Sequence, residues 1–197
     1  MAFKFSSNEM TMISNELLKH PTIRLHGKVD DAMLASFLEQ MATAVDSTGT
    51  ILLELTTTGG DAELGRRIAT DLMLARDRLG LDIVFLGKSV VYSAGVSIMS
   101  GFKPEKRFLT KDCMLLIHER RLNKTLELKG AMRGMEALVR DTLAEIESAL
   151  RMERTAFAYL TSGTDVTLDE LMEKISHSDW YLTDEEALKR KVIAGIL

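Results

Sequence analysis

An α/β fold with parallel strands is predicted by the regular alternation of strand-like and helix-like segments along this chain. Short apolar or alternating runs are each followed by a stretch whose apolar residues recur at helical spacing. This order requires right-handed crossovers between parallel strands. The 197 residues include only two prolines and contain no linker or low-complexity tract. We therefore expect residues 21–197 to form one domain and residues 1–20 to form a loosely held arm.

The amino-terminal half of that domain supplies three strands and three helices. A strand is expected over 22–27, where polar and apolar residues alternate, and a second over 51–55, which stops at the turn 57–60. A third, buried strand is expected over 82–87. Helices with recurring apolar residues are expected over 33–45, 64–75 and 93–100.

The carboxy-terminal half supplies two more strands, over 107–109 and 114–117, and one unusually long helix over 129–160. The apolar stripe of this helix consists of Met132, Met135, Val139, Leu143, Ile146, Leu150, Phe157 and Leu160. A helix of this length exceeds what one small sheet can cover, so part of it is expected to pack on another subunit. The capping pairs Thr167/Glu170 and Thr183/Glu186 predict the starts of two short helices.

Composition excludes several classes of protein. Hydrophobic residues make up 46% and charged residues 27% of the chain, as in soluble globular proteins, and the net charge of −4 without a basic block argues against nucleic-acid binding. No apolar run approaches the roughly 20 residues that span a bilayer, and the polar start predicts no signal peptide. The single cysteine, Cys113, lies in an apolar run and is expected to be a buried hydrophobe in a reducing, cytoplasmic compartment.

Ser93 is the candidate nucleophile. It lies in the segment 90–95, where a strand-like run meets the start of a helix. A hydroxyl there would point outward, and charge developing on its oxygen would be stabilised by the positive end of the helix. Gly95, two residues later, would let a substrate backbone approach closely. The alternative is an ordinary serine at a helix N-cap.

His118 is the candidate general base, and Asp179 is the candidate acid that orients it. His118 follows the apolar strand 114–117 and so is expected on the rim of a sheet, where sites form. Asp179 precedes Trp180 and Tyr181, two aromatic residues that are expected to bury it and hold it against an imidazole. A surface histidine and a turn aspartate without a role are the alternatives.

The pair Gly59-Gly60 follows a strand and precedes a helix. Acyl transfer needs a nucleophile, a base, an orienting acid and donors for the oxyanion, and free N–H groups in this turn could be those donors. A tight turn without such a role is the alternative. No Gly-x-x-x-x-Gly-Lys pattern is present, so nucleotide binding is not expected, and we expect no cofactor and no metal.

Five segments occur in a characteristic order: 24–31 before a helix, 51–60 running into Gly-Gly, Tyr-Ser-Ala-Gly at 92–95, 114–118 ending in histidine, and 179–187. His118 follows Ser93 by 25 residues. Over about residues 22–197 this order and spacing resemble those of the Clp protease proteolytic subunit (ClpP) family, which are serine peptidases of the S14 type.

The resemblance implies the ClpP/crotonase-like superhelix of β-β-α units, in which the long helix is a handle that stacks two rings into a closed chamber. It implies a homo-oligomeric serine endopeptidase acting on peptide or unfolded protein substrates, with Ser93 as nucleophile, His118 as base and Asp179 as acid. By position, the backbone N–H groups of Gly60 and Ala94 would stabilise the oxyanion.

Some positions depart from the family pattern. Thr58 replaces the proline of the Ser-Pro-Gly-Gly turn, and Glu119-Arg120 follows the histidine in place of Gln-Pro. The segment 122–126 stands where the family has a glycine-rich stretch that holds substrate as an added strand. Asp179 follows His118 by 61 residues, a longer separation than usual, which we assign to an extended handle.

A further departure concerns the partner that unfolds substrate. Leu52 and Glu54 stand where the family has two tyrosines of the pocket that docks an ATPase unfoldase. A carboxylate in an apolar docking pocket is costly unless it is paired. We therefore expect that an ATPase partner would not dock in the usual way.

Three other functions compete with the peptidase. A catalytically silent ClpP-like scaffold subunit would retain the fold in a mixed ring. A crotonase-type acyl-CoA enzyme would hold a thioester oxyanion with the two glycine turns but leaves His118 and Asp179 unexplained. A Ser/Lys dyad of the signal-peptide-peptidase type would use Lys88 or Lys106 as base, against which the expected lack of a membrane anchor counts.

Overall fold

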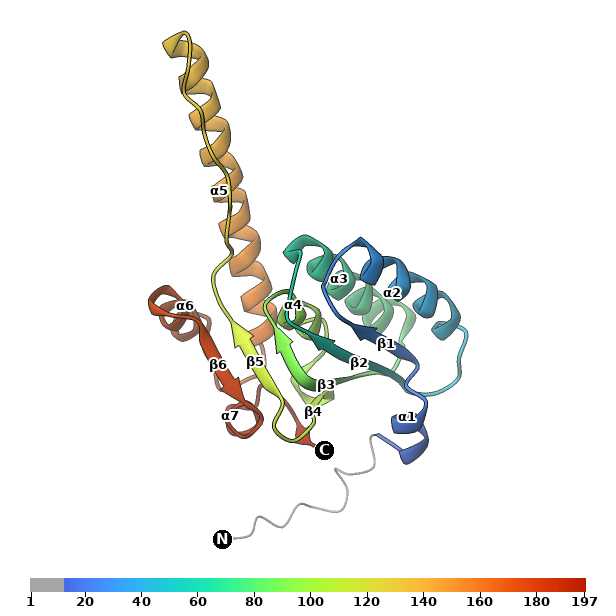
Figure 1. Ribbon diagram of the computed structural model, residues 1–197. Helices are drawn as coiled ribbons and strands as arrows, with labels where there is room; N and C mark the ends of the chain where they lie inside the picture. The colour runs from blue at the N-terminus through green and yellow to red at the C-terminus, as the bar shows by residue number, and fades with distance from the viewer. Residues whose placement is uncertain (1–12) are drawn as a thin grey trace.

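The computed structural model describes residues 13–197, and Figure 1 shows a sheet flanked by helices with one long helix leaving the body. The helices are α1 (Asn15–Lys19), α2 (Asp31–Ala44), α3 (Ala62–Leu79), α4 (Ala94–Met99), the 3-10 turn Pro104–Lys106, α5 (Met132–Thr161), α6 (Leu168–His177) and α7 (Asp184–Lys189). The strands are β1 (Ile23–His26), β2 (Ile51–Thr57), β3 (Ile83–Tyr92), β4 (Arg107–Leu109), β5 (Met114–Ile117), β6 (Trp180–Thr183) and β7 (Gly195–Ile196). The predicted alternation is confirmed.

The sheet is parallel except at one pair of strands. Its order is β1-β2-β3-β4-β7, while β5 pairs with β3 and β6 pairs with β5 in the antiparallel direction. The first half of β3 pairs with β4 and its second half with β5. Strand β3 runs past the predicted end at residue 87 to Tyr92, and Ser89 adopts a φ of 61° between the two halves. This extension delivers the chain directly to Ser93.

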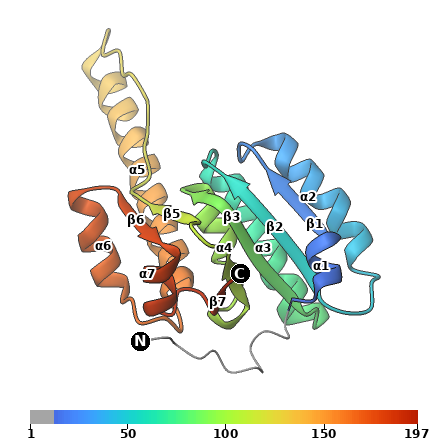
Figure 2. The ribbon, with the colours of Figure 1, turned by 60° about the horizontal axis from the view of Figure 1, so that its bottom comes forward.

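The main core lies between the sheet and the helices α2, α3 and α4, which cover one face of it (Figures 1 and 2). Alternation along β2 sends Ile51, Leu53 and Leu55 to this core and Leu52 to a smaller apolar cluster on the other face. Because the parallel strands at the centre are apolar on both faces, each face needs a cover.

Helix α1 covers part of that second face. Ile13 is buried there, and Leu17 and Leu18 pack on a cluster made by Leu52, Val84, Leu86 and Phe108. The expectation of a loosely held arm is therefore wrong for residues 13–19. Helix α1 packs there because the second face of the sheet is apolar and would otherwise be exposed to water. The earlier part of the expected arm, residues 1–12, lies outside the described residues.

Helix α5 has 30 residues and is therefore about 45 Å long. Its carboxy-terminal part contacts α4 and α6, whereas its amino-terminal part leaves the body, with residues 118–131 running back along it (Figure 1). The expected excess length is confirmed, because the apolar stripe remains exposed at Met132, Val139, Leu143, Ile146 and Leu150. No helix within residues 13–197 is long and apolar enough to span a bilayer.

Arg107, in β4, links the carboxy-terminal end of α5 to the sheet through hydrogen bonds. Its guanidinium is buried and donates to the carbonyl oxygens of Phe102 (2.7 and 2.9 Å), Leu160 (2.9 Å) and Val192 (3.4 Å). Burial lowers the pKa of Arg107 to about 10. The Leu160 carbonyl is one of the last in α5, so Arg107 satisfies a group that the helix itself leaves unpaired.

Both predicted capping pairs are confirmed. The Thr167 hydroxyl accepts a hydrogen bond from the Glu170 N–H at the start of α6. Thr183 and Glu186 form a full capping box at the start of α7, each side chain bonding the other residue's backbone. Together they fix where α6 and α7 begin, on either side of the strand that follows Asp179.

Candidate active site

Ser93 joins the end of β3 to the start of α4 in a strained conformation. Its φ is 54° and its ψ is −115°, in a region that non-glycine residues rarely adopt. Its N–H donates to the Leu116 carbonyl at 2.8 Å, which fixes the turn to β5. Ser93 occupies the N-cap position, but its side chain makes no capping hydrogen bond. The alternative of an ordinary N-cap serine is therefore wrong, and the hydroxyl makes no hydrogen bond within the described residues.

The strand register brings Ser93, His118 and Asp179 to one edge of the sheet. In the parallel pair, Tyr92 lies opposite Leu116, so the chain leaves β3 and β5 side by side at Ser93 and Ile117. In the antiparallel pair, Ile117 lies opposite Trp180. Continued by one residue, this register would place His118 opposite Asp179, just beyond the last pair of the ladder. His118 thus follows β5, which lies between β3, the strand before Ser93, and β6, the strand after Asp179.

The side chains at this edge have other partners, however. Asp179 accepts from Nη2 of Arg121 at 2.9 and 3.0 Å, and His118 Nδ1 lies 2.6 Å from the Glu119 carbonyl oxygen. Within residues 13–197, no hydrogen bond joins Ser93 to His118 or His118 to Asp179. The expectation that two aromatic residues bury Asp179 is wrong, since its side chain is 37% exposed and is held by Arg121.

The flanking aromatic residues point to different neighbours. Tyr181 meets Tyr92 edge to face, with ring centroids 6.0 Å apart. The ammonium of Lys174 lies 5.1 Å from the centre of the Trp180 ring. Strand alternation explains this, because successive residues of β6 face opposite sides of the sheet. Arg121 was not anticipated from the sequence, because it lies in a segment of irregular structure.

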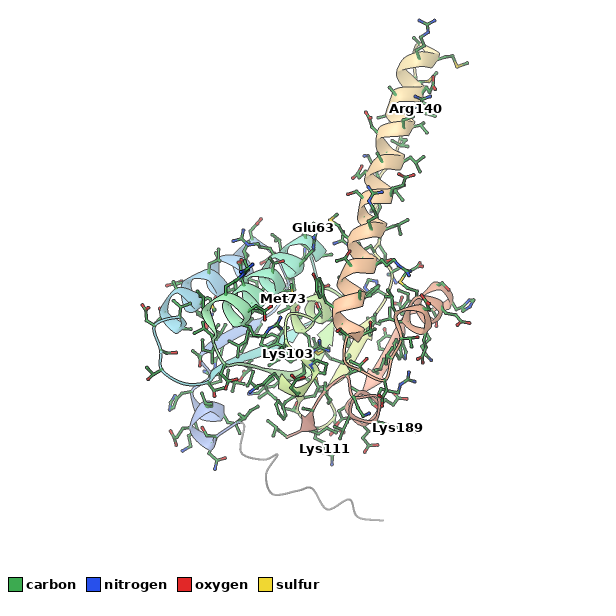
Figure 3. The ribbon with its side chains drawn as sticks, turned by 180° about the vertical axis from the view of Figure 1, so that it is seen from behind. Glu63, Met73, Lys103, Lys111, Arg140 and Lys189 are labelled. Atoms are coloured by element: carbon green, nitrogen blue, oxygen red, sulfur yellow. The ribbon has the colours of Figure 1, made fainter. Side chains whose placement is uncertain are left out.

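A cavity of 690 Å³ opens at this edge of the sheet. Gly60, Ser93, Ala94 and His118 line it together, whereas Asp179 is not among its lining residues. The start of α3 and the middle of α5 supply the facing walls, and Figure 3 shows Glu63 at the end of α3 that is turned toward α5. The predicted nucleophile, base and oxyanion donors therefore share one space that a substrate could enter.

The backbone at Gly60 is held so that its own N–H remains free. The bridge between Gly60 and Val29 uses the N–H of Val29, which donates to the Gly59 carbonyl, and the N–H of Asp61, which donates to the Val29 carbonyl. A Cβ at Gly60 would lie 2.2 Å from the Val29 oxygen, at a φ of 153° that favours glycine. The N–H groups of Gly60 and Ala94 have no acceptor within residues 13–197.

Gly95 serves packing. A Cβ at this position would lie 2.4 Å from Cγ2 of Thr57 and 3.2 Å from Cγ1 of Val91, so α4 approaches the sheet too closely for a side chain. This packing accounts for the glycine without the close approach of a substrate that the sequence suggested. The position still contributes to the site, because it sets how near α4 and Ser93 lie to the strands.

Cys113 is fully buried, as predicted. Burial, together with the charge of Asp184, raises the pKa of the thiol to about 12. A thiol with so high a pKa is not a nucleophile near neutral pH. No group of three His, Cys, Asp or Glu side chains in the described part of the chain is arranged to hold a metal ion.

A sequence profile of the Clp protease family matches residues 6–197. The chain belongs to the Clp protease family. Its relatives include the ATP-dependent Clp protease proteolytic subunit of Streptococcus sanguinis, which is 26% identical over 94% of this chain and 88% of that protein. Proteolytic subunit 2 of Bifidobacterium longum is 25% identical over 89% of this chain and 78% of that protein.

The fold of this Clp family member agrees with that of a solved relative. A mutant of ClpP1 from Listeria monocytogenes superposes with a TM-score of 0.73 at 17% identity, covering 92% of this chain and 94% of that one. The predicted ClpP fold is therefore confirmed.

Proposed function

We propose that this protein is a serine endopeptidase in which Ser93 is the nucleophile, His118 the general base and Asp179 the orienting acid. The strand register carries the proposal, since it gathers these residue types at one sheet edge. The strained, uncapped Ser93 in a cavity shared with His118 supports it. The proteolytic-subunit names of the relatives agree with it.

The proposed reaction begins when Ser93 Oγ attacks the carbonyl carbon of a peptide bond and His118 accepts the hydroxyl proton. The N–H groups of Gly60 and Ala94 donate to the resulting oxyanion. His118 then gives its proton to the leaving amine, and the carbon–nitrogen bond breaks to leave an acyl ester on Ser93. Water attacks that ester with His118 again accepting a proton, which releases the carboxylic product and restores the hydroxyl.

Two side-chain movements must precede this reaction. His118 must exchange the Glu119 carbonyl for Asp179 as the partner of Nδ1, and Asp179 must release Arg121. Both groups lie at the end of a regular ladder, so the backbone need not move far. Asp179 would then fix the tautomer in which Nε2 of His118 can accept the Ser93 proton.

The reaction is proposed to take place inside a homo-oligomeric chamber made of stacked rings. The exposed stripe of α5 supports this, together with the neighbouring exposed leucines Leu122, Leu126 and Leu128. An exposed apolar surface of this kind marks an interaction site. Native mass spectrometry should give an oligomer that the variant Leu143→Glu dissociates, whereas Leu79→Glu, at an exposed residue of α3, should leave the mass unchanged. A monomer in the unaltered protein would contradict the proposal.

An ATPase unfoldase is not proposed to dock here in the family's usual way. Glu54 is paired with Lys88 at 2.6 Å, and both project from the sheet face on which α1 packs. Helix α1 therefore already covers part of the apolar surface of that face, and the Glu54–Lys88 ion pair borders it. Co-sedimentation with an ATPase unfoldase and ATP tests this, and co-assembly whose affinity is unaltered by Glu54→Ala would contradict it.

A cytoplasmic location, which the buried, unpaired Cys113 suits, is part of the same proposal.

Labelling with a fluorophosphonate probe tests the peptidase. Modification of Ser93 in the unaltered protein, and its loss in both Ser93→Ala and His118→Ala, is the expected result. Asp179→Asn should retain the fold but lower the peptidase rate by several orders of magnitude, as in other triad enzymes. A folded oligomer that no probe labels would instead indicate the silent scaffold. Nearly full activity in Asp179→Asn would remove Asp179 from the mechanism.

A further inference from the structure

A buried carboxyl group faces the cavity beside Ser93. Glu153 lies in the part of α5 that crosses the site, is only 3% exposed and lines the same cavity. One of its oxygens, Oε2, accepts a hydrogen bond from the backbone N–H of Arg120 at 2.5 Å. No donor within residues 13–197 reaches its other oxygen, Oε1, which is open to the solvent-accessible space of the cavity. A carboxylate this deeply buried usually has a full set of partners.

Several other charged groups of the cavity are paired, although Asp61 and Glu119 form no ion pair within the described residues. Glu63 bonds Arg120 Nη1 at 2.6 Å and has Arg66 at 4.0 Å, while Glu145 bonds Lys124. Arg121 is held by Asp179. Within the described residues, by contrast, no lysine or arginine lies within 4.0 Å of the Glu153 carboxylate. The cavity is lined by more carboxyl groups than guanidinium groups. The carboxyl groups belong to Asp61, Glu63, Glu119, Glu145 and Glu153. The guanidinium groups belong to Arg66, Arg120 and Arg121.

Much of the remaining lining of the cavity is apolar. It includes Val96, Ile117, Ile146, Leu150 and Phe157. A ligand group that suits this space has a long aliphatic stem, which packs on such walls, and a cationic N–H head, which supplies the missing donors. A lysine or arginine side chain has both parts, whereas an aliphatic side chain would leave the carboxyl group desolvated and half satisfied.

We propose that Glu153 determines substrate specificity and directs cleavage to peptide bonds preceded by lysine or arginine. This inference rests on the proposed function, because the cavity receives the side chain that precedes the scissile bond only if Ser93 attacks there. With the oxyanion bound at Gly60 and Ala94, the acyl side chain enters the space between α4 and α5. Its head group then meets the free oxygen of Glu153.

A purely structural role of Glu153 makes a different prediction. The bond to the Arg120 N–H holds the segment that follows His118 against α5, so losing it would displace the base. Such a displacement would slow the cleavage of every substrate by the same factor. The ratio between two substrates separates the roles, because only a contact with the substrate side chain changes that ratio.

The experiment compares two fluorogenic peptides that differ only in the residue before the scissile bond, lysine in one and norleucine in the other. Norleucine keeps the stem of lysine and lacks its ammonium group. We expect kcat/KM to favour lysine by about tenfold or more in the unaltered protein, as a charge-assisted hydrogen bond would give. Equal rates for the two peptides would overturn the inference without any variant.

Glu153→Gln is the matched variant, because glutamine has the same shape and its carbonyl can still accept from the Arg120 N–H. It should reduce the lysine/norleucine ratio to about one or below, since the charge is lost. Glu147→Gln, on the same helix but outside the cavity lining, should keep the original ratio. An unchanged ratio in Glu153→Gln overturns the inference. If a small fluorophosphonate fails to label Ser93 at all, the proposed function itself falls, and this inference falls with it.

Discussion

Replacing Arg121 with methionine should increase the peptidase rate, because Arg121 occupies the carboxylate that His118 needs. One guanidinium nitrogen donates to both oxygens of Asp179, at 2.9 and 3.0 Å. As long as this pair is intact, Asp179 cannot orient the imidazole, whose Nδ1 bonds the Glu119 carbonyl instead. Methionine retains most of the stem and removes the competing charge.

The size of the effect follows from the exposure of the pair. The Arg121 side chain is 72% exposed and that of Asp179 is 37% exposed. An ion pair in such a position contributes about 0.2 to 1 kcal/mol. If the protein must break it before each turnover, its removal should raise kcat/KM by a factor of about 1.4 to about 5.

The assay is kcat/KM for a short fluorogenic peptide, measured from about 0.05 to about 0.5 M NaCl, over which salt screens exposed charges. The rate of the unaltered protein should rise with salt toward that of Arg121→Met, whose own rate should stay flat. Arg67→Met, which removes an exposed partner of Asp71 on α3, should leave the salt response as in the unaltered protein. A lower rate in Arg121→Met at equal oligomeric mass would refute the reasoning.

Three further predictions concern the framework. Gly60→Ala should slow fluorophosphonate labelling of Ser93 and lower the melting temperature, because the new Cβ meets the Val29 carbonyl at 2.2 Å; equal labelling would contradict the assigned backbone geometry. Arg107→Met should lower the free energy of unfolding in urea by about 3 kcal/mol or more, since several buried carbonyls lose their donor, and Arg107→Lys should recover only part; a loss below about 1 kcal/mol would contradict this. Cys113 should resist thiol reagents at pH 8, because burial raises the pKa of its thiol to about 12. Above about pH 9 only the unfolded state loses the thiol proton, so the free energy of unfolding should fall by up to about 1.4 kcal/mol per pH unit. Cys113→Ala should lack that slope.

The sequence predicted the framework of the site because its framework residues follow simple periodic rules. The strands β2 and β5 are apolar runs that end in turns, and α5 has an apolar stripe longer than any one sheet needs. The capping pairs at Thr167 and Thr183 depend on residues three apart, so they too could be predicted from the sequence. These are local signals, and the structure follows them.

The remaining features depend on contacts between distant segments. Arg121 lies in an exposed segment without regular structure, and it finds Asp179 only because β5 and β6 pair. The packing of α1 could not be predicted, because its partners Leu52, Val84 and Phe108 are recognisable as a second core face only once the register is known. Glu153 similarly stands out only when its burial is compared with its single hydrogen bond.

The link between His118 and α5 predicts that the proposed activity depends on protein concentration. The chain passes from His118 directly into the segment that runs along α5, and Glu153 of that helix holds the Arg120 N–H two residues beyond the histidine. A contact that moves the exposed part of α5 therefore reaches the base through only a few bonds. If the exposed part of α5 packs against a second copy, as proposed above, specific activity per chain should rise with protein concentration.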